Sequence, residues 1–291
     1  MLTVYDSASY DTDIANQRYR HRERYSEEEW RLYLEAVFQE YSRFGKELVV
    51  ISSQTGTKIV VSNWEAANDA PKDQMWYLEG GQDGPYLEYL KSRLSGLRQG
   101  IAKGLEEGFK GRVETAFEFT LLWEGMDPNP WDEIPPRTIS DFEIGVRELK
   151  EFVDVWSYSS WASVWYLEDT LTTETMVEYN RQSMETAFRR MRYVCGGCRI
   201  IVGEVGYLYG FPESSAVLRA LIETALEQGA EKIFSWVLYD QPREKWVEFG
   251  SFDETGRLTE TGDLLRRMTQ EIPKGRRGRG SRTAPGGGRG R

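Results

Sequence analysis

The stretch KIVVSNWEAANDA, residues Lys58–Ala70, begins as a strand and then changes character. Its β-branched run IVV is typical of a buried strand. Asn63, Trp64 and Glu65 follow at once, placing an amide, a large aromatic ring and a carboxylate in direct succession. The pattern predicts a strand whose C-terminal end carries chemistry.

Strand and helix patterns alternate from this stretch to the end of the chain. We expect strands over 58–62, 112–123, 152–161, 199–206 and 232–240, and helices over 26–45, 85–108, 141–151, 172–196 and 212–229. Each intervening helix is long enough to cross back over a sheet, so the alternation predicts a parallel sheet with helices outside it. No GxGxxG or GKS/GKT phosphate loop occurs in the sequence, which argues against a nucleotide-binding fold.

Polar and aromatic residues gather where these strands end, among them Trp123, Tyr158, Glu204 and Trp236. In a parallel barrel, the loops after the strands build the active site at this edge. Glu65 and Glu204 each close an apolar strand, where a carboxylate is costly to bury unless it is paired or functional. Two such groups can divide acid and nucleophile roles between them in glycosidic bond hydrolysis. Structural ion pairs with arginines are the alternative.

The order VVSNWE, VDVWSYSSW, IIVGEVG and IFSWVLYD resembles the (β/α)8-barrel glycoside hydrolases of the large retaining clan. Counted back from Trp236 on the presumed last strand, Glu204 ends strand seven and Glu65 follows strand four. The resemblance implies that Glu65 is the acid/base and that Glu204 is the nucleophile. It implies further that Trp236 is the platform beneath the sugar and that Tyr158 is a partner of the nucleophile.

The same resemblance suggests two more contacts beside Glu65. Asn63 would bind the 2-hydroxyl of the sugar, and Trp64 would form a side wall of the pocket. Several tryptophans could line an extended cleft for an oligo- or polysaccharide, because their flat faces stack on sugar rings; they are Trp123, Trp131, Trp156, Trp161 and Trp165.

The resemblance spans about Leu2 to Met268 but accounts only for the later strands of the barrel. MLTVYDSAS can supply the end of a third strand, and no earlier sequence remains for strands one and two. We therefore expect a TIM-type barrel that is N-terminally incomplete, with five to six strands. Residues 1–272 would form it, either as a fragment of a longer protein or completed by a partner chain.

Charge divides the chain into an acidic body and a basic tail. The net charge is −10, and the seven basic residues from Lys274 to Arg291 leave −17 on the rest. The Gly/Arg-rich segment 273–291 has no apolar core to fold around, so we expect disorder with at most a weak, salt-sensitive polyanion contact.

Composition excludes several other classes. His21 is the only histidine and lies in a highly charged segment, so a histidine base is not expected, and no metal or cofactor is expected. Cys195 and Cys198 in CGGC are interpreted as incidental thiols in a tight turn. No signal peptide or spanning segment is visible, so the chain as written is predicted to be a soluble cytoplasmic protein, its location undetermined if it is truncated.

Three functional hypotheses remain open at this point. The first is a retaining glycosidase that uses Glu65 and Glu204. The second is a non-catalytic carbohydrate-binding or scaffold protein. The third, an RNA-associated protein that uses the basic tail, rests on composition alone.

Overall fold

The computed structural model describes residues 2–3, 18–63, 66, 70, 73–120, 122, 140–164, 172–207, 211, 213–235, 250–253 and 255–271. The strands are β1 Leu2–Thr3, β2 Ile59–Ser62, β3 Val113–Phe119, β4 Val155–Ser159, β5 Ile200–Val205 and β6 Ile233–Ser235. The α-helices are α1 Glu27–Thr55, α3 Pro85–Glu106, α4 Asp141–Leu149, α5 Thr173–Cys195, α6 Ser214–Glu227 and α7 Glu260–Glu271. The 3₁₀ helices are η1 Arg18–Arg24, η2 Asp73–Met75 and η3 Ser160–Ser163.

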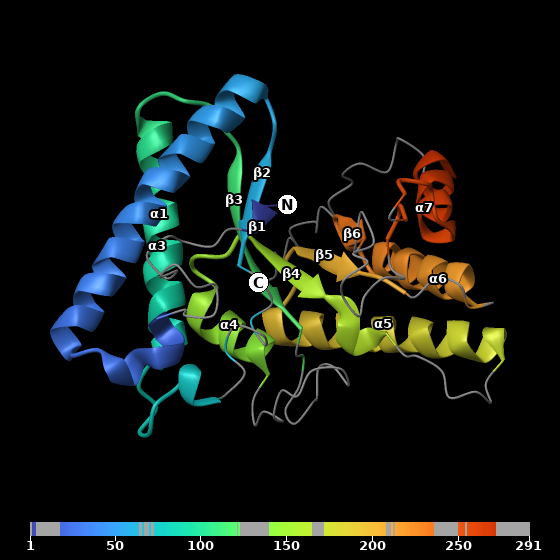
Figure 1. Cartoon of the computed structure of the whole chain (residues 1–291), viewed down its shortest axis with the longest axis horizontal. Coiled ribbons are helices and arrows are strands. Elements are labelled where there is room, and N and C mark those ends of the chain that lie inside the picture. Colours follow the sequence, from blue (N-terminus) through green and yellow to red (C-terminus); the bar gives the residue numbers. More distant parts are fainter. Residues whose placement is uncertain are drawn as a thin grey trace, which may run out of the picture.

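The six strands form one sheet in the order β1-β2-β3-β4-β5-β6, and every described pair is parallel. The sheet curves and the helices lie outside it, α1 and α3 at one end and α5 and α6 at the other (Figure 1). This arrangement confirms the predicted TIM-type architecture with five to six strands. Within the described ranges, β1 and β6 each pair with a single neighbour.

Local sequence explains why the helices begin and end where they do. Ser26 caps α1 in a capping box with Glu29. Pro85 opens α3, and Gly196, with φ of 68°, ends α5. A disulfide joins Cys195, the last residue of α5, to Cys198 beyond it, with Cα atoms 5.6 Å apart, so the interpretation of both as incidental thiols is corrected.

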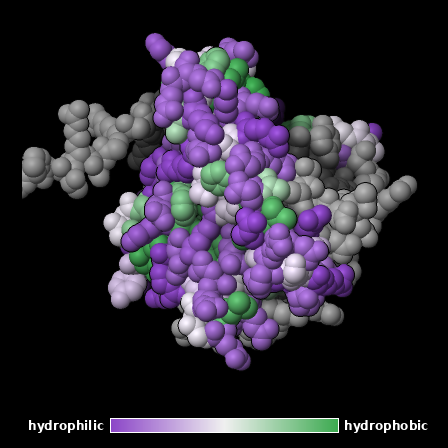
Figure 2. All heavy atoms as spheres, turned by 90° about the vertical axis from the view of Figure 1, so that its left-hand side faces the viewer, coloured by the Kyte–Doolittle hydropathy of each residue, from purple (hydrophilic) through white to green (hydrophobic). Residues whose placement is uncertain are grey.

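Helix α1 continues ten residues past the end expected at Gly45. Gly45 lies within the helix, at a place where α1 approaches α3 closely. A Cβ atom at Gly45 would lie 2.5 Å from the backbone oxygen of Leu97. The glycine therefore permits close helix packing. The outer face of this pair is largely hydrophilic with scattered apolar side chains (Figure 2).

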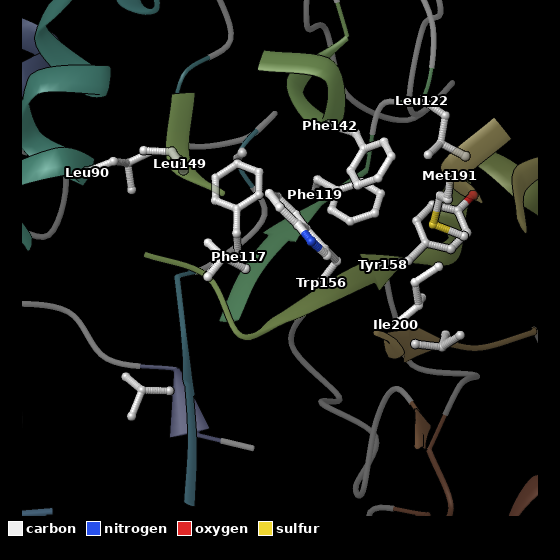
Figure 3. Close-up of a cluster of buried hydrophobic side chains, with 14 of the residues drawn as sticks. Leu90, Phe117, Phe119, Leu122, Phe142, Leu149, Trp156, Tyr158, Met191 and Ile200 are labelled. Carbon is white, nitrogen blue, oxygen red and sulfur yellow. The ribbon is translucent and has the colours of Figure 1, made fainter. Parts of the chain in front are cut away.

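The core has two parts, one on each side of the sheet. The larger part lies between sheet and helices and contains the aromatic side chains of Phe117, Phe119, Phe142, Trp156 and Tyr158 (Figure 3). The smaller part lies on the inner face of the curved sheet and consists of Ala116, Val155 and Ile201, with Val60 and Phe234 packed against them. Side chains two residues further along β3 and β4 belong to the same inner face.

Several predicted features lie outside the described residues. They are Trp64, Glu65, Trp123, Trp131, Trp165, Trp236 and the tail from 273. Among the helices that the structure describes, none is long and apolar enough to cross a membrane.

Candidate active site

The inner face changes from apolar to polar toward the C-terminal ends of the strands. Directly beyond Ala116 and Val155 come Glu118 and Ser157, which are paired in the register of β3 and β4. The hydroxyl of Ser157 donates a hydrogen bond of 2.9 Å to Oε2 of Glu118. Glu118 is 1% exposed, so its carboxyl group is enclosed by protein on all sides.

A β-bulge in β5 brings Glu204 to the same face. Tyr158 pairs with Val202, but the next residue, Ser159, pairs with Glu204, so that Gly203 is the extra residue. A Cβ atom at Gly203 would lie 2.2 Å from Oγ of Ser157 and 2.7 Å from Oε2 of Glu118. Only glycine fits at this place, and the bulge lets the following glutamate point inward.

Three donors from β4 and η3 fix Glu204. The indole nitrogen of Trp161 donates a hydrogen bond of 2.9 Å to Oε2, and the hydroxyl of Ser159 donates one of 3.3 Å to the same oxygen. The hydroxyl of Ser160 binds the backbone oxygen of Glu204 at 2.8 Å. Glu204 is 8% exposed. Hydrogen bonds to a buried carboxylate favour its ionised form and hold its orientation.

Asn63 links the end of β2 to Glu118. Its Nδ2 donates to the backbone oxygen of Glu118 at 3.1 Å, and its Oδ1 accepts from the backbone nitrogen of Glu118 at 2.8 Å. The side chain, which is 3% exposed, thus continues the sheet ladder by one step. A contact between Asn63 and a sugar hydroxyl stays a prediction.

The aromatic residues of β4 lie on the other side of the sheet. Trp156 packs edge-on against Phe117 and Phe142 in the layer beneath the helices (Figure 3), so the expectation that it lines a cleft is corrected. Tyr158 lies in the same layer, with its ring 5.5 Å from that of Phe119. Its role as a partner of Glu204 stays a prediction; the side-chain donors described above come from Ser159 and Trp161.

Glu118 is the site residue that sequence analysis misses. Burial raises the pKa of Glu118 well above its usual range, the nearby charge of Glu204 raises it further, and the hydrogen bond from Ser157 partly opposes both. The sequence contained a usable indication, because a glutamate between two phenylalanines within a predicted strand must face either a core or a site.

The arrangement brings together two buried carboxyl groups, three serines and an indole N–H at the C-terminal ends of adjacent parallel strands. The charge of Glu204 acts on the carboxyl group of Glu118, so the protonation of the two groups is linked. In the described part of the chain, no cluster of histidine, cysteine, aspartate or glutamate is arranged to hold a metal ion.

Solved structures with a similar fold include glycoside hydrolases. A β-glucosidase from Thermotoga maritima in complex with glucoimidazole aligns with a TM-score of 0.52 at 10% identity, covering 88% of this chain and 72% of that one. A GH5_18 protein from Streptomyces cattleya in complex with Manb1-4GlcNAc aligns with a TM-score of 0.51 at 14% identity, covering 82% and 55%.

Endo-glycoceramidase II from a Rhodococcus species, solved as a lactosyl-enzyme intermediate, aligns at 14% identity with a TM-score of 0.46, covering 78% of this chain. The chain spans 44% of that protein and 55% of the Streptomyces one, about half the length of each. No protein-family model and no curated protein sequence matches the chain. At these identities the likeness is one of fold, and at that level it confirms the resemblance to (β/α)8-barrel glycoside hydrolases.

Proposed function

We propose that the chain is a retaining glycoside hydrolase, with Glu204 as nucleophile and Glu65 as acid/base. The observation that carries the proposal is the setting of Glu204. Its carboxylate ends a strand of a glycosidase-like barrel on the inner face, where the N–H of Trp161 and the hydroxyl of Ser159 hold Oε2. A nucleophilic carboxylate needs such fixed donors, because it must stay ionised and in line with the anomeric carbon.

In the proposed reaction, Glu204 attacks the anomeric carbon of a bound oligo- or polysaccharide. The glycosidic bond breaks as Glu65 protonates the leaving oxygen, and a glycosyl ester forms on Glu204. Water, deprotonated by Glu65, then attacks the same carbon and releases Glu204 as a carboxylate. This double displacement requires the two carboxyl groups to lie about 5 to 5.5 Å apart.

The remaining site residues take the roles that the resemblance suggests. Trp236 would be the platform beneath the reacting sugar, Trp64 a side wall and Trp123 part of a longer cleft. All three lie outside the described residues, so these roles are proposals from the sequence. The position of Trp161 beside Glu204 adds one described aromatic ring to this group.

Mechanism-based labelling tests the proposal directly. A panel of 2-deoxy-2-fluoro glycosides with activated leaving groups, covering gluco, manno and galacto configurations, is incubated with the chain and the peptides are mapped by mass. The expected result is one covalent glycosyl adduct on the peptide that contains Glu204, absent in Glu204→Gln. The control variant Glu114→Gln changes a glutamate at the opposite edge of the barrel, so its Glu204 should still be labelled.

An adduct on another carboxylate would overturn the assignment of Glu204. The alternative function is a non-catalytic carbohydrate-binding or scaffold protein. It is favoured because, within the described ranges, β1 and β6 each pair with only one neighbouring strand and the barrel is not closed. Under that alternative, glycans would quench tryptophan fluorescence while neither adduct nor product forms with any sugar of the panel.

A further inference from the structure

Glu118 is a buried glutamate for which the proposed mechanism has no use. It lies on β3, next to the strand that carries Ser157, and its carboxyl group packs against the backbone at Gly203, the residue before Glu204. A group so completely buried is expensive to keep charged.

The surroundings of Glu118 provide no described cation to balance a charge. From β2 the neutral amide of Asn63 binds the backbone of Glu118, and from β4 the hydroxyl of Ser157 binds its carboxyl group. From β5 it meets the backbone at Gly203 and the charge of Glu204, the one ionisable group among the described residues whose charge acts on it. Arg93 of α3 is also buried, but it is directed to the backbone oxygen of Ser62 and the ring of Tyr41.

Two carboxyl groups buried in one site do not both ionise readily, because the second charge meets the repulsion of the first. The hydrogen bonds decide which group keeps the proton. Oε2 of Glu204 accepts from two donors, Trp161 and Ser159, which favour the charged form. Glu118 accepts from one hydroxyl and is the more deeply buried of the two.

We propose that Glu118 holds the proton of the Glu118–Glu204 pair, as a positioning residue that keeps a single negative charge in the site and keeps it on Glu204. The position of the proton follows from the burial of both residues and from the donors to each carboxyl group. Its importance for catalysis rests on the proposed function, in which Glu204 must be the charged partner.

The first test measures stability against pH and needs no activity. Unfolding by urea is followed for the wild type, Glu118→Gln and Glu114→Gln between pH 4 and pH 8. If Glu118 is neutral when folded, the folded wild type binds more protons than the unfolded chain above the unfolded pKa of about 4.3. Its folding equilibrium constant then falls by up to about tenfold per pH unit until Glu118 ionises.

Glu118→Gln cannot lose a proton there, so its urea midpoint should rise relative to the wild type as pH increases and approach it near pH 4. Glu114→Gln is the matched control, since Glu114 lies on the same strand but is paired with Arg199 and Lys58, which lower its pKa. It should lose stability relative to the wild type as pH rises, the opposite trend. Parallel curves for Glu118→Gln and the wild type would overturn the proposal.

A second variant keeps the test decisive if Glu118→Gln does not fold. Ser157→Ala leaves Glu118 in place and removes the hydrogen bond that opposes protonation. In Ser157→Ala, the decrease in stability with rising pH that is expected for the wild type should therefore continue to higher pH. Infrared spectra at neutral pH provide the complementary readout: the wild type should show the C=O stretch of a protonated carboxyl group. A spectrum with ionised carboxylates only would contradict the proposal.

Activity, if the labelling experiment finds it, separates this proposal from the proposed function. In kcat/KM against pH, Glu118→Gln should move the alkaline limb to higher pH and leave the acidic limb in place. If the chain is a hydrolase but the stability curves of Glu118→Gln and the wild type are parallel, the proposed function stands and the proposal on Glu118 fails. If the curves diverge but no glycoside labels the chain, the proposal on Glu118 stands and the proposed function fails.

Discussion

The two ends of strand β3 place glutamates in opposite electrostatic settings. At the N-terminal edge of the barrel, Glu114 lies 2.9 Å from Arg199 and 2.7 Å from Lys58, and Arg199 also binds Glu231. Four residues later, at the C-terminal edge, Glu118 faces another carboxyl group. The two side chains point to the same face of the strand, so the difference comes from their neighbours.

The comparison shows how the neighbours of a glutamate set the direction of its pKa shift. Burial alone would raise the pKa of Glu114, but hydrogen bonds from Arg199 and Lys58 lower it, so this carboxylate stays charged and joins three strands. Glu118 has the same side chain and a raised pKa. In barrel enzymes the N-terminal edge generally serves stability and the C-terminal edge carries the active site. The proposed function assigns the same division to the two ends of β3.

The largest effect is expected from Asn63→Asp at the C-terminal edge. The introduced carboxylate would face the backbone oxygen of Glu118 in place of an amide donor, without solvent to relieve the repulsion. We expect a loss of about 3 kcal/mol in the free energy of unfolding at pH 7, measured by urea denaturation. The loss should shrink as pH falls through the pKa of the new carboxyl group, which can then donate a proton. A pH-independent loss would show that the amide only fills space.

Trp161→Phe tests whether the donor to Glu204 matters beyond the ring that carries it. The variant keeps an aromatic face but loses the N–H that binds Oε2. A hydrogen bond to a charged group contributes about 1.5 to 3 kcal/mol, so kcat/KM should drop by roughly 10- to 150-fold if the chain is a hydrolase. Trp156→Phe, in the layer beneath the helices, is the control and should affect stability more than turnover. Equal turnover in Trp161→Phe and the wild type would remove Trp161 from the site.

Gly203→Ala tests how closely the C-terminal edge is packed. The added methyl group would meet Ser157 and Glu118 at distances that real contacts do not reach. Overpacking of this kind costs about 1 to 3 kcal/mol, measured as a loss in the free energy of unfolding. The double variant with Ser157→Ala should recover part of it, because one of the two clashing atoms is gone. Strict additivity of the two changes would contradict the close approach.

Arg199→Met should have the smallest effect. The arginine binds two carboxylates but is 40% exposed, so solvent screens the pairs, and a loss of about 1 kcal/mol at pH 7 is expected. Arg199 lowers the pKa of both Glu114 and Glu231, so the stabilisation is present above their unfolded pKa values. It disappears as pH falls through the lowered folded values. Thermal denaturation of both proteins at pH 3 and pH 7 checks this; an equal difference at both would exclude the ion pairs.

The fold could be predicted from the alternation of strand and helix patterns, because β-branched runs and capped amphipathic segments are local properties. The extent of α1 could not, since Gly45 ends a helix or permits a crossing depending on what packs against it. The same limit applies to β4, where Trp156 and Tyr158 alternate with Ser157 and Ser159. Both faces of a parallel sheet are buried, so hydrophobicity alone does not tell which set faces the helices.

The candidate site could be predicted only in part, because some of its residues are marked by local pattern and others only by strand pairing. Glu204 stands at the visible end of an apolar strand, a position that pattern analysis can find. Glu118 lies within its strand, and its significance depends on the register that places Ser157 opposite and on the bulge that brings Glu204 beside it. Strand register and bulges depend on how the strands pair in the folded chain, so local sequence patterns do not reveal them. The disulfide between Cys195 and Cys198 likewise depends on the geometry of the turn that joins them.

The bulge at Gly203 has a consequence for anyone who would transplant or shorten this barrel. Deleting that one residue would leave a regular strand of good composition, with every hydrogen bond of the ladder available. Glu204 would then take the place of Gly203, where a Cβ atom lies 2.2 Å from Oγ of Ser157 and 2.7 Å from Oε2 of Glu118, so its side chain would be forced away from its present donors. The setting of Glu204 thus depends on chain length as much as on residue identity, and a graft that copies the side chains without the extra glycine would lose that setting.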